Sequence, residues 1–297
     1  MEAILNADFD IDNPSKTERG DYYAKITRFL SGGCEVVMKC VRPMAHAKYA
    51  EQWEQGFPVS MLPKKEKSAS EIEVERAQNH RRAVRKAKQT TRFLCQQMKA
   101  DRLLTLTYRE NVEDREQVRK QFQEFVRYVH KGWKGQPGMP NWRYVAVLER
   151  QERGAYHVHC AVQGWNPVKF LRMCWYKALG AAGDATKENA PGQIDLSPPR
   201  NHSGASRKKE WAVDRLAFYI VKYMQKTFDE TSTEKNRYWR SKDIVKPEQY
   251  MHWLVATNLT AALNELYRHM DFAEGFQLKK HWLSNDDMVY WCAGVGG

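Results

Sequence analysis

The chain has 297 residues and a formal net charge of +12 at pH 7, because 48 Lys and Arg outnumber 36 Asp and Glu. This excess favours a polyanionic partner such as nucleic acid, and the 10 Trp and 14 Tyr include rings that can stack on bases. The six Cys form no Cys-x-x-Cys pair, which excludes zinc-finger spacing, and no apolar run reaches membrane-spanning length. The acidic beginning of the chain lacks the pattern of a signal peptide, so we expect a cytoplasmic protein with free thiols.

Residues 1–63 are predicted to form an accessory region. Strands are expected at Tyr22–Phe29 and Cys34–Val41, and the intervening Ser31, Gly32 and Gly33 are typical of a hairpin turn.

Residues 64–92 are predicted to form a basic helical segment, whose cationic side chains include Arg81, Arg82, Arg85 and Lys86. One interpretation is a helix that lies along DNA phosphates. The other is an ordinary helix whose charges face water. The position of the segment directly before the first strand of the next region favours DNA binding.

Residues 93–230 are predicted to form one α+β domain. The expected elements are a strand at Leu103–Tyr108, a helix at Asn111–Trp133, two strands within Tyr144–Gly164, a helix opened by Asn166 as N-cap and by Pro167, a strand at Gln193–Leu196 and a helix at Asp214–Phe228. This order matches a ferredoxin-like (RRM-like) fold, in which helices cover one face of an antiparallel sheet.

Residues 231–297 are predicted to form a C-terminal helical extension. One or two helices are expected in Pro247–Met270, and Trp282–Trp291 is expected to add a strand.

The hairpin within Tyr144–Gly164 contains a candidate metal site. His157 and His159 are two residues apart, so both imidazoles leave the same face of a strand. Glu149 falls close to opposite His157 across the turn, and Glu152, nearer the turn, is the second choice for the carboxylate. Two His and one carboxylate are typical of a divalent metal site with open positions. The alternative is a pair of partly exposed strand histidines without metal.

The helix at Asp214–Phe228 contains two phenols one turn apart. Tyr219 and Tyr223 share a face with Lys222 and Lys226. A phenol can act as a nucleophile, and a nearby ammonium can bind a phosphate or favour the phenolate. The alternative is that the tyrosines are boundary residues of a packing helix and the lysines are solvated.

Together these stretches resemble the three motifs of the HUH endonucleases, the rolling-circle replication initiators of single-stranded DNA phages and plasmids. Leu103–Tyr108 is similar to the first motif and His157-Val158-His159, preceded by Glu149 and Gly154, is similar to the second. The stretch from Tyr219 to Lys226 is similar to the third, in its two-tyrosine form. The resemblance covers about residues 90 to 230.

The resemblance implies Mg²⁺ or Mn²⁺ on His157, His159 and Glu149, and a tyrosine nucleophile that forms a 5′-phosphotyrosine and leaves a 3′-OH primer. It implies single-stranded origin DNA as substrate in a bacterial host cytoplasm, with a host polymerase as partner. A helicase is also expected as a partner, because no Walker A pattern is present. Rival interpretations are a transposase or relaxase of the same chemistry, and a non-catalytic ferredoxin-like nucleic-acid-binding module.

The segment Pro198–Lys209 is polar and basic and is expected to be a loop near DNA. Its cationic side chains include Arg207, Lys208 and Lys209.

Overall fold

The computed structural model describes residues 21–41, 67–135, 140–164, 166–181, 189–197, 213–228, 238–254, 256, 258–274, 277–284 and 289–295. The chain divides into two compact units: a terminal unit drawn from Met1–Lys67 and Glu248–Gly297, and a central unit, Ser68–Pro247. The N-terminal and C-terminal regions, which the sequence analysis treats separately, therefore contribute to one unit. The loop Pro198–Lys209, with Arg207, Lys208 and Lys209, lies outside the described residues.

The central unit contains a five-stranded antiparallel sheet with the strand order β6-β3-β5-β4-β7. The strands are β3 (Arg102–Tyr108), β4 (Tyr144–Arg150), β5 (Tyr156–Val162), β6 (Gly192–Ser197) and β7 (Trp239–Arg240). The order strand, helix, strand, strand, helix, strand, helix from β3 to α6 is as predicted. The α+β class is confirmed, and the architecture is compatible with a ferredoxin-like fold.

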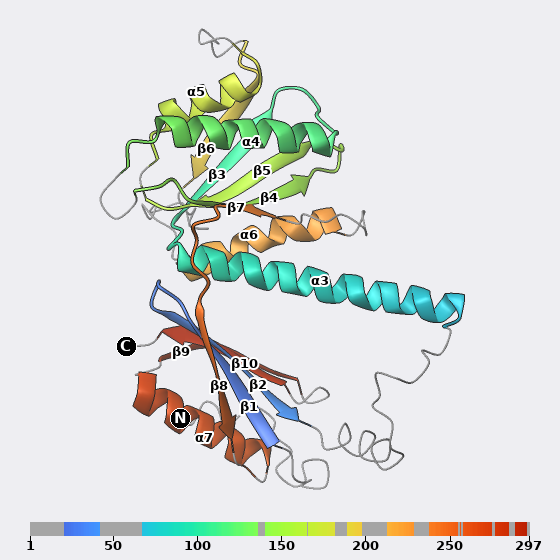
Figure 1. Ribbon diagram of the computed structural model, residues 1–297, viewed down its shortest axis with the longest axis vertical. Helices are drawn as coiled ribbons and strands as arrows, with labels where there is room; N and C mark the ends of the chain where they lie inside the picture. The colour runs from blue at the N-terminus through green and yellow to red at the C-terminus, as the bar shows by residue number, and fades with distance from the viewer. Residues whose placement is uncertain are drawn as a thin grey trace, which may run out of the picture. The chain divides into compact units, whose positions relative to one another are not determined.

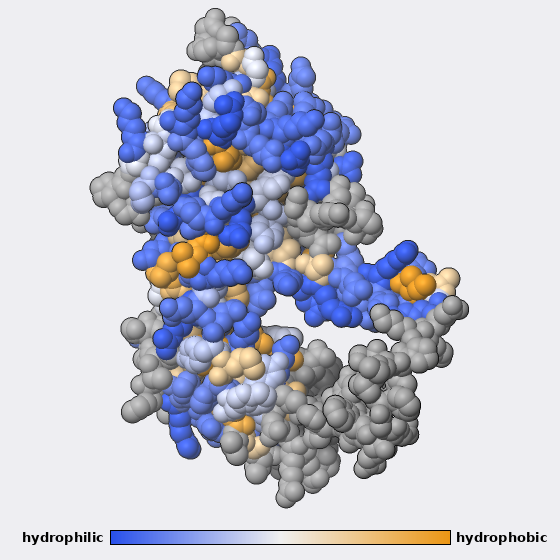
Figure 2. Space-filling model, in the orientation of Figure 1, coloured by the Kyte–Doolittle hydropathy of each residue, from blue (hydrophilic) through white to orange (hydrophobic). Residues whose placement is uncertain are grey.

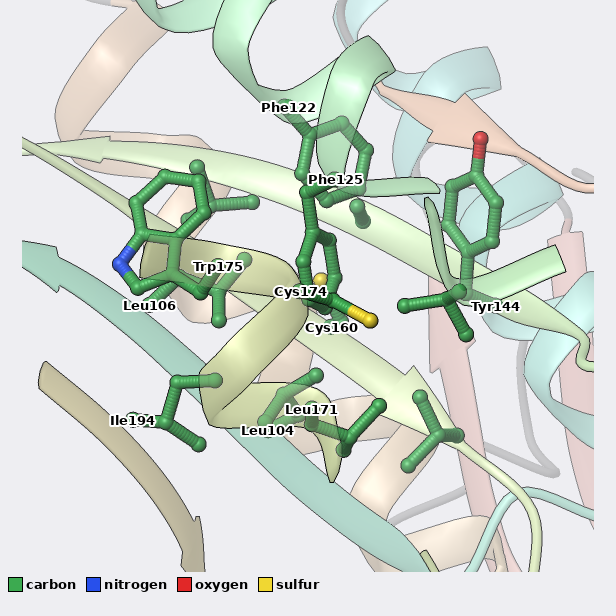
Figure 3. Close-up of a cluster of buried hydrophobic side chains, with 14 of the residues drawn as sticks. Leu104, Leu106, Phe122, Phe125, Tyr144, Cys160, Leu171, Cys174, Trp175 and Ile194 are labelled. Atoms are coloured by element: carbon green, nitrogen blue, oxygen red, sulfur yellow. The ribbon is translucent and has the colours of Figure 1, made fainter. Parts of the chain in front are cut away.

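One face of this sheet is covered by α4 (Arg115–Gly132) and α5 (Val168–Ala178) (Figure 1). Figure 3 shows the resulting core, where Phe122 and Phe125 of α4 lie near Trp175 of α5. The rings of Phe125 and Trp175 meet edge to face at 5.8 Å between centroids. Such aromatic pairs contribute beyond the area they bury.

The helix α5 does not begin as the sequence predicts. Its N-cap is Pro167, and Asn166 lies before it. The Asn166 side chain is fully buried and accepts a hydrogen bond from Trp142 Nε1 at 2.7 Å. Its amide donates to the carbonyl oxygens of Gln163 and Gly164, both at 3.0 Å. These partners use the polar atoms of Asn166, so its side chain serves the strand-to-helix loop instead of capping the helix.

The opposite face of the sheet is covered by α6 (Val213–Phe228), with α3 (Ala69–Gln97) packed in the same cluster (Figure 1). The expectation that all helices lie on one face is therefore wrong. The cause is visible in β4, whose first six residues are all buried. A strand that is apolar on both sides needs a covering layer on both faces.

The helix α3 begins with a capping box: Glu71 N donates to Ser68 Oγ at 3.2 Å, and Ser68 N donates to Glu71 Oε2 at 2.7 Å. Its buried residues begin only at Ala87, so the preceding turns lie on the surface. Figure 2 shows a mainly hydrophilic surface along this helix, with a hydrophobic patch near its beginning, where Ile72 and Val74 are exposed.

The terminal unit contains a second antiparallel sheet with the order β8-β1-β2-β10-β9 and one described helix, α7. The elements are β1 (Asp21–Arg28), β2 (Gly33–Val41), β8 (Glu248–Leu254), α7 (Leu259–Glu274), β9 (Gln277–Ser284) and β10 (Val289–Val295). The N-terminal hairpin is as predicted.

The C-terminal residues are not a helical extension. Glu248–Leu254, expected to be helical, is the strand β8, and two strands occupy the stretch where one was expected. Local periodicity favoured a helix, but β8 pairs with β1 from Tyr22↔Leu254 to Arg28↔Glu248. That pairing joins segments far apart in the chain, which local pattern does not register.

Replacing Gly192 with alanine is expected to lower the free energy of unfolding by about 1–3 kcal/mol, as overpacking typically does. An added Cβ would collide with the backbone oxygen of Thr107 and lie 2.9 Å from Trp175 Nε1, which itself donates to that oxygen at 3.1 Å. Urea unfolding measures the change. The exposed neighbour Gln193→Ala is the control, with an expected change within about 0.5 kcal/mol; equal effects would contradict the packing argument.

Candidate metal and tyrosine site

The β4–β5 hairpin places the candidate ligands on one face of the sheet. Glu149 lies directly opposite His157 in the register, and His159 lies opposite Val147. The turn is closed by Gln151 N, which donates to the backbone oxygen of Ala155 at 2.8 Å. Gly154 adopts a φ of 90° there, which a residue with a Cβ rarely adopts. The alternate residues of β5 face the other core, as the sequence predicts.

Each imidazole is held by neighbouring side chains. His159 Nε2 lies 2.8 Å from Glu149 Oε2, and His159 Nδ1 lies 3.2 Å from Thr105 Oγ1. His157 Nδ1 lies 3.1 Å from Gln151 Nε2. Such contacts fix ring orientation around metal-binding histidines.

Glu149, His157 and His159 fit a divalent cation. One ligand atom from each lies within 4.8 Å of the others. Glu149 and His159 are 7% and 4% exposed, so a carboxylate without a cationic partner would be costly here. Burial, together with positive charge on His159 and Arg153, lowers the pKa of His157. A lowered pKa keeps the imidazole neutral, which is the form that binds metal.

Glu152, the second choice for the carboxylate, is exposed in the turn. Glu149, Gln151, Glu152 and Arg153 line an open pocket beside the cluster. The pocket therefore gives access to the buried carboxylate of Glu149.

The helix α6 brings its two phenols to this cluster. The Tyr223 ring stacks on the His159 ring with 3.6 Å between centroids and 8° between planes. Tyr223 OH donates a hydrogen bond to Tyr219 OH at 3.0 Å. Burial chiefly, and then the bond to Tyr219 and the negative charge of Glu149, raise the pKa of Tyr223. Tyr223 is therefore held as the protonated donor, and Tyr219 is the acceptor.

The apolar face of α6 explains this placement. Leu216, Ile220 and Met224 are buried in the cluster that contains Val145 and Val147 of β4. Tyr219 and Tyr223 flank this stripe and are only partly buried.

The lysines of α6 lie on its exposed side. Lys222 is exposed, with Nζ 5.8 Å from the centroid of the Tyr219 ring. Lys226 lies within α6, and its side chain is outside the described part of the structure.

The basic residues of α3 lie in the same unit but do not contribute to the metal cluster. Arg81, Arg82, Arg85 and Lys86 are all exposed on the turns of α3 before its buried residues begin. Arg82 contacts Gln78 Oε1 at 3.4 Å within its own helix. Their guanidinium and ammonium groups are thus displayed to solvent, as either interpretation of this segment requires.

The sequence analysis missed Thr105 and Gln151 as partners of the histidines. Thr105 belongs to the Thr-x-Thr of β3, and the signal was present in that motif, but its contact depends on the β3–β5 register, Thr105↔His159. Gln151 was seen only as a turn residue.

Replacing Thr105 with valine is expected to weaken Mn²⁺ binding about 10–100-fold, because loss of an outer-shell partner frees the ligand ring. Titration calorimetry measures the affinity. Thr107→Val, two residues farther along the same strand, is the matched control and is expected to bind as the wild type. Equal affinity in both variants would show that Thr105 does not position His159.

None of the helices in the described part of the chain combines the length and the apolar character that crossing a bilayer requires.

A family model described as a replication-associated protein of the ORF2 type matches residues 101–228. This range is less than half of the chain, and it contains Glu149, His157, His159, Tyr219 and Tyr223. A second model, "Alkylated DNA repair protein alkB homolog 8, N-terminal", matches residues 77–113 and contains none of those five. No curated protein and no solved structure matches the chain.

Proposed function

We propose that this protein initiates rolling-circle replication by nicking and rejoining single-stranded DNA through a tyrosine. The observation that carries the proposal is the stacking of Tyr223 on His159, which places two phenols beside a Glu-His-His cluster. A match to replication-associated proteins over residues 101–228 supports a role in replication.

Glu149, His157 and His159 would hold Mg²⁺ or Mn²⁺. When bound, the cation supplies polarisation of the scissile phosphate and neutralisation of its charge. The choice between the two metals follows availability in the cell more than affinity. The open pocket lined by Glu149, Gln151 and Arg153 offers space beside the cluster, and Arg153 adds a cationic group there.

The reaction is a transesterification that conserves the number of phosphoester bonds. The phenol oxygen of a tyrosine forms a bond to phosphorus, the bond from phosphorus to the 3′ oxygen breaks, and the phenol proton ends on that 3′ oxygen. The products are a 5′-phosphotyrosine and a free 3′-OH that can prime a polymerase. Because the bond energy is retained, the reverse reaction joins a strand without ATP.

Tyr219 is proposed as the first nucleophile. Its oxygen accepts the hydrogen bond from Tyr223, and a hydrogen bond to the charged form favours that form. The raised pKa of Tyr223 makes it the poorer phenolate. Lys222, at 5.8 Å from the Tyr219 ring centroid, adds positive charge on the same side. Tyr223 is proposed to attack in the second, strand-joining round.

Contacts to the DNA backbone are assigned to the exposed cations of α3. Arg81, Arg82, Arg85 and Lys86 offer guanidinium and ammonium groups for phosphates. Arg207, Lys208 and Lys209 are proposed for the same role on their sequence position alone. Host polymerase and helicase remain the proposed partners.

A covalent-adduct assay tests the proposal. The full chain is incubated with labelled single-stranded circular DNA and Mn²⁺, with EDTA as the control, and resolved on a denaturing gel. A metal-dependent adduct of protein and DNA is expected. Absence of any adduct with strands that include the cognate origin would leave a binding module. Adducts restricted to hairpin ends, with transfer between two DNAs, would instead indicate a transposase.

A further inference from the structure

The sheet of the terminal unit has one face covered by α7 and one face with several exposed side chains. Tyr22, Ala24 and Ile26 of β1 are buried with residues of α7 such as Leu263 and Leu266. Because side chains alternate along a strand, Tyr23 and Lys25 lie on the opposite face. We call this second surface the open face of the sheet.

The register of the strands defines two rows across the open face. The first row runs through Trp253, Tyr23 and Lys39. The second row runs through Met251, Lys25, Val37, Trp291 and Trp282. Each row therefore combines aromatic or aliphatic groups with lysine.

Large apolar side chains in these rows are exposed to solvent. Trp253 is 57% exposed, Trp282 is 55% exposed and Met251 is 54% exposed. Tyr23 and Trp253 lie side by side, with 5.7 Å between their ring centroids. Surface tryptophans clustered in this way are uncommon on a surface without a binding partner, and their flat rings are suited to stacking.

The charges of the open face are positive. Lys25 and Lys39 are exposed within the two rows, and Lys280 lies in the next row. Among the described residues of the two rows, no side chain is acidic. The next row also contains Thr27 and Glu35, but these are 3% and 5% exposed, so that part of the sheet is not offered to a ligand.

From this chemistry we infer that the open face of the terminal unit binds single-stranded DNA by stacking bases on Tyr23, Trp253 and Trp282 and pairing phosphates with Lys25 and Lys39. Stacking platforms with interleaved cations are typical of single-strand binding, because every unpaired base has an exposed ring face. A duplex keeps its bases stacked on one another and offers the lysines only its phosphates.

A second copy of the chain is a poorer occupant. Two open faces brought together would oppose lysine rows of the same sign, which is destabilising. The choice of DNA over RNA rests on the proposed function. The site itself consists of residues that take no part in nicking, so its binding is measured without metal.

The test uses the full chain in EDTA and a fluorescein-labelled oligothymidylate, with fluorescence anisotropy as the readout. Trp253→Ala and Trp282→Ala are each expected to weaken binding at least about fivefold, the lower end of one base–aromatic stack. Lys25→Gln and Lys39→Gln are each expected to reduce the slope of log affinity against log salt by about 0.7. Duplex of the same length is expected to bind more weakly than the single strand.

Matched controls are available on α4 and α5. Lys120→Gln removes an exposed lysine of α4, and Met173→Ala removes a methionine of α5 that is 57% exposed, for comparison with Met251→Ala. Both controls are expected to bind as the wild type. Circular dichroism checks that each variant is folded, and the lysine variants keep the test valid if a tryptophan variant is not.

Three results would overturn the inference: wild-type affinity in all open-face variants, equal losses in the α4 and α5 controls, or a dimer that dissociates in Trp253→Ala while DNA affinity is unchanged. Tighter binding of oligouridylate than oligothymidylate would reassign the surface to RNA. Failure of the nicking proposal would appear separately, because it would remove the covalent adduct and leave binding in EDTA intact.

Discussion

The double variant Tyr219→Phe/Tyr223→Phe is expected to form no covalent adduct with DNA in the presence of Mn²⁺, with nicking reduced at least about a thousandfold. Loss of the nucleophile in covalent catalysis typically costs several orders of magnitude. The substitutions remove two phenol oxygens that lie 3.0 Å apart and keep both rings. Denaturing gels of protein and labelled strand measure the adduct.

The single variants separate the two phenols. Tyr219→Phe is expected to slow the first cleavage more than Tyr223→Phe, because Tyr219 is the hydrogen-bond acceptor and Tyr223 the donor with a raised pKa. Tyr223→Phe is expected to cut once and to fail mainly in the joining round. Rapid-quench kinetics of one turnover distinguish the two steps.

A phenol remote from the cluster provides the control for these variants. Tyr128 belongs to α4, on the other face of the sheet, and Tyr128→Phe is expected to nick as the wild type. An adduct that survives in the double variant would refute the assignment of the nucleophile to α6. Loss of the first cleavage in Tyr223→Phe alone would reverse the proposed order.

His159→Ala is expected to abolish measurable Mn²⁺ binding and to lower nicking about 10²–10³-fold. The ring of His159 contacts Glu149 at 2.8 Å, Thr105 at 3.2 Å and the ring of Tyr223, so its removal affects both the ligand set and the stacked tyrosine. A cation at a developing charge contributes several kcal/mol. Titration calorimetry measures the metal, and adduct gels measure the chemistry.

Thermal unfolding gives a readout that does not depend on activity. A cation that binds only the folded protein raises its midpoint with concentration, and this Mn²⁺-dependent rise is expected in the wild type and absent in His159→Ala. Glu149→Gln, which keeps the shape of the side chain and removes its charge, is expected to show a reduced rise. His281→Ala changes an exposed histidine of β9 and is expected to retain the full rise. An unchanged rise in His159→Ala would exclude this cluster as the metal site.

Local pattern carried much of the fold of the central unit. The alternation in β5, the apolar run of β4 and the period of α4 each agree with the structure, because burial of one face imposes its period on the sequence. The spacing of His157 and His159 placed both rings on one side of the sheet, and Glu149 opposite His157 follows from the short turn. The roles of these residues remain predictions.

Local pattern failed where contacts join distant segments. Glu248–Leu254 has a helix-compatible composition and is a strand, since β1 offers it a partner more than two hundred residues earlier in the chain. Its pairing also merges the two ends of the chain into one unit. A seven-residue window contains no information about such a partner.

The sequence by itself determined the order of elements from β3 to α6, the two histidines on one face and the two phenols on one helical turn, because each depends on spacing within a single element. Only the tertiary structure decided that α6 covers the face of the sheet that carries the histidines, opposite α4 and α5. That choice stacks Tyr223 on His159 and brings Thr105 and Gln151 to the rings. It depends on which apolar surfaces pack together, and packing between elements is a property of the folded chain as a whole.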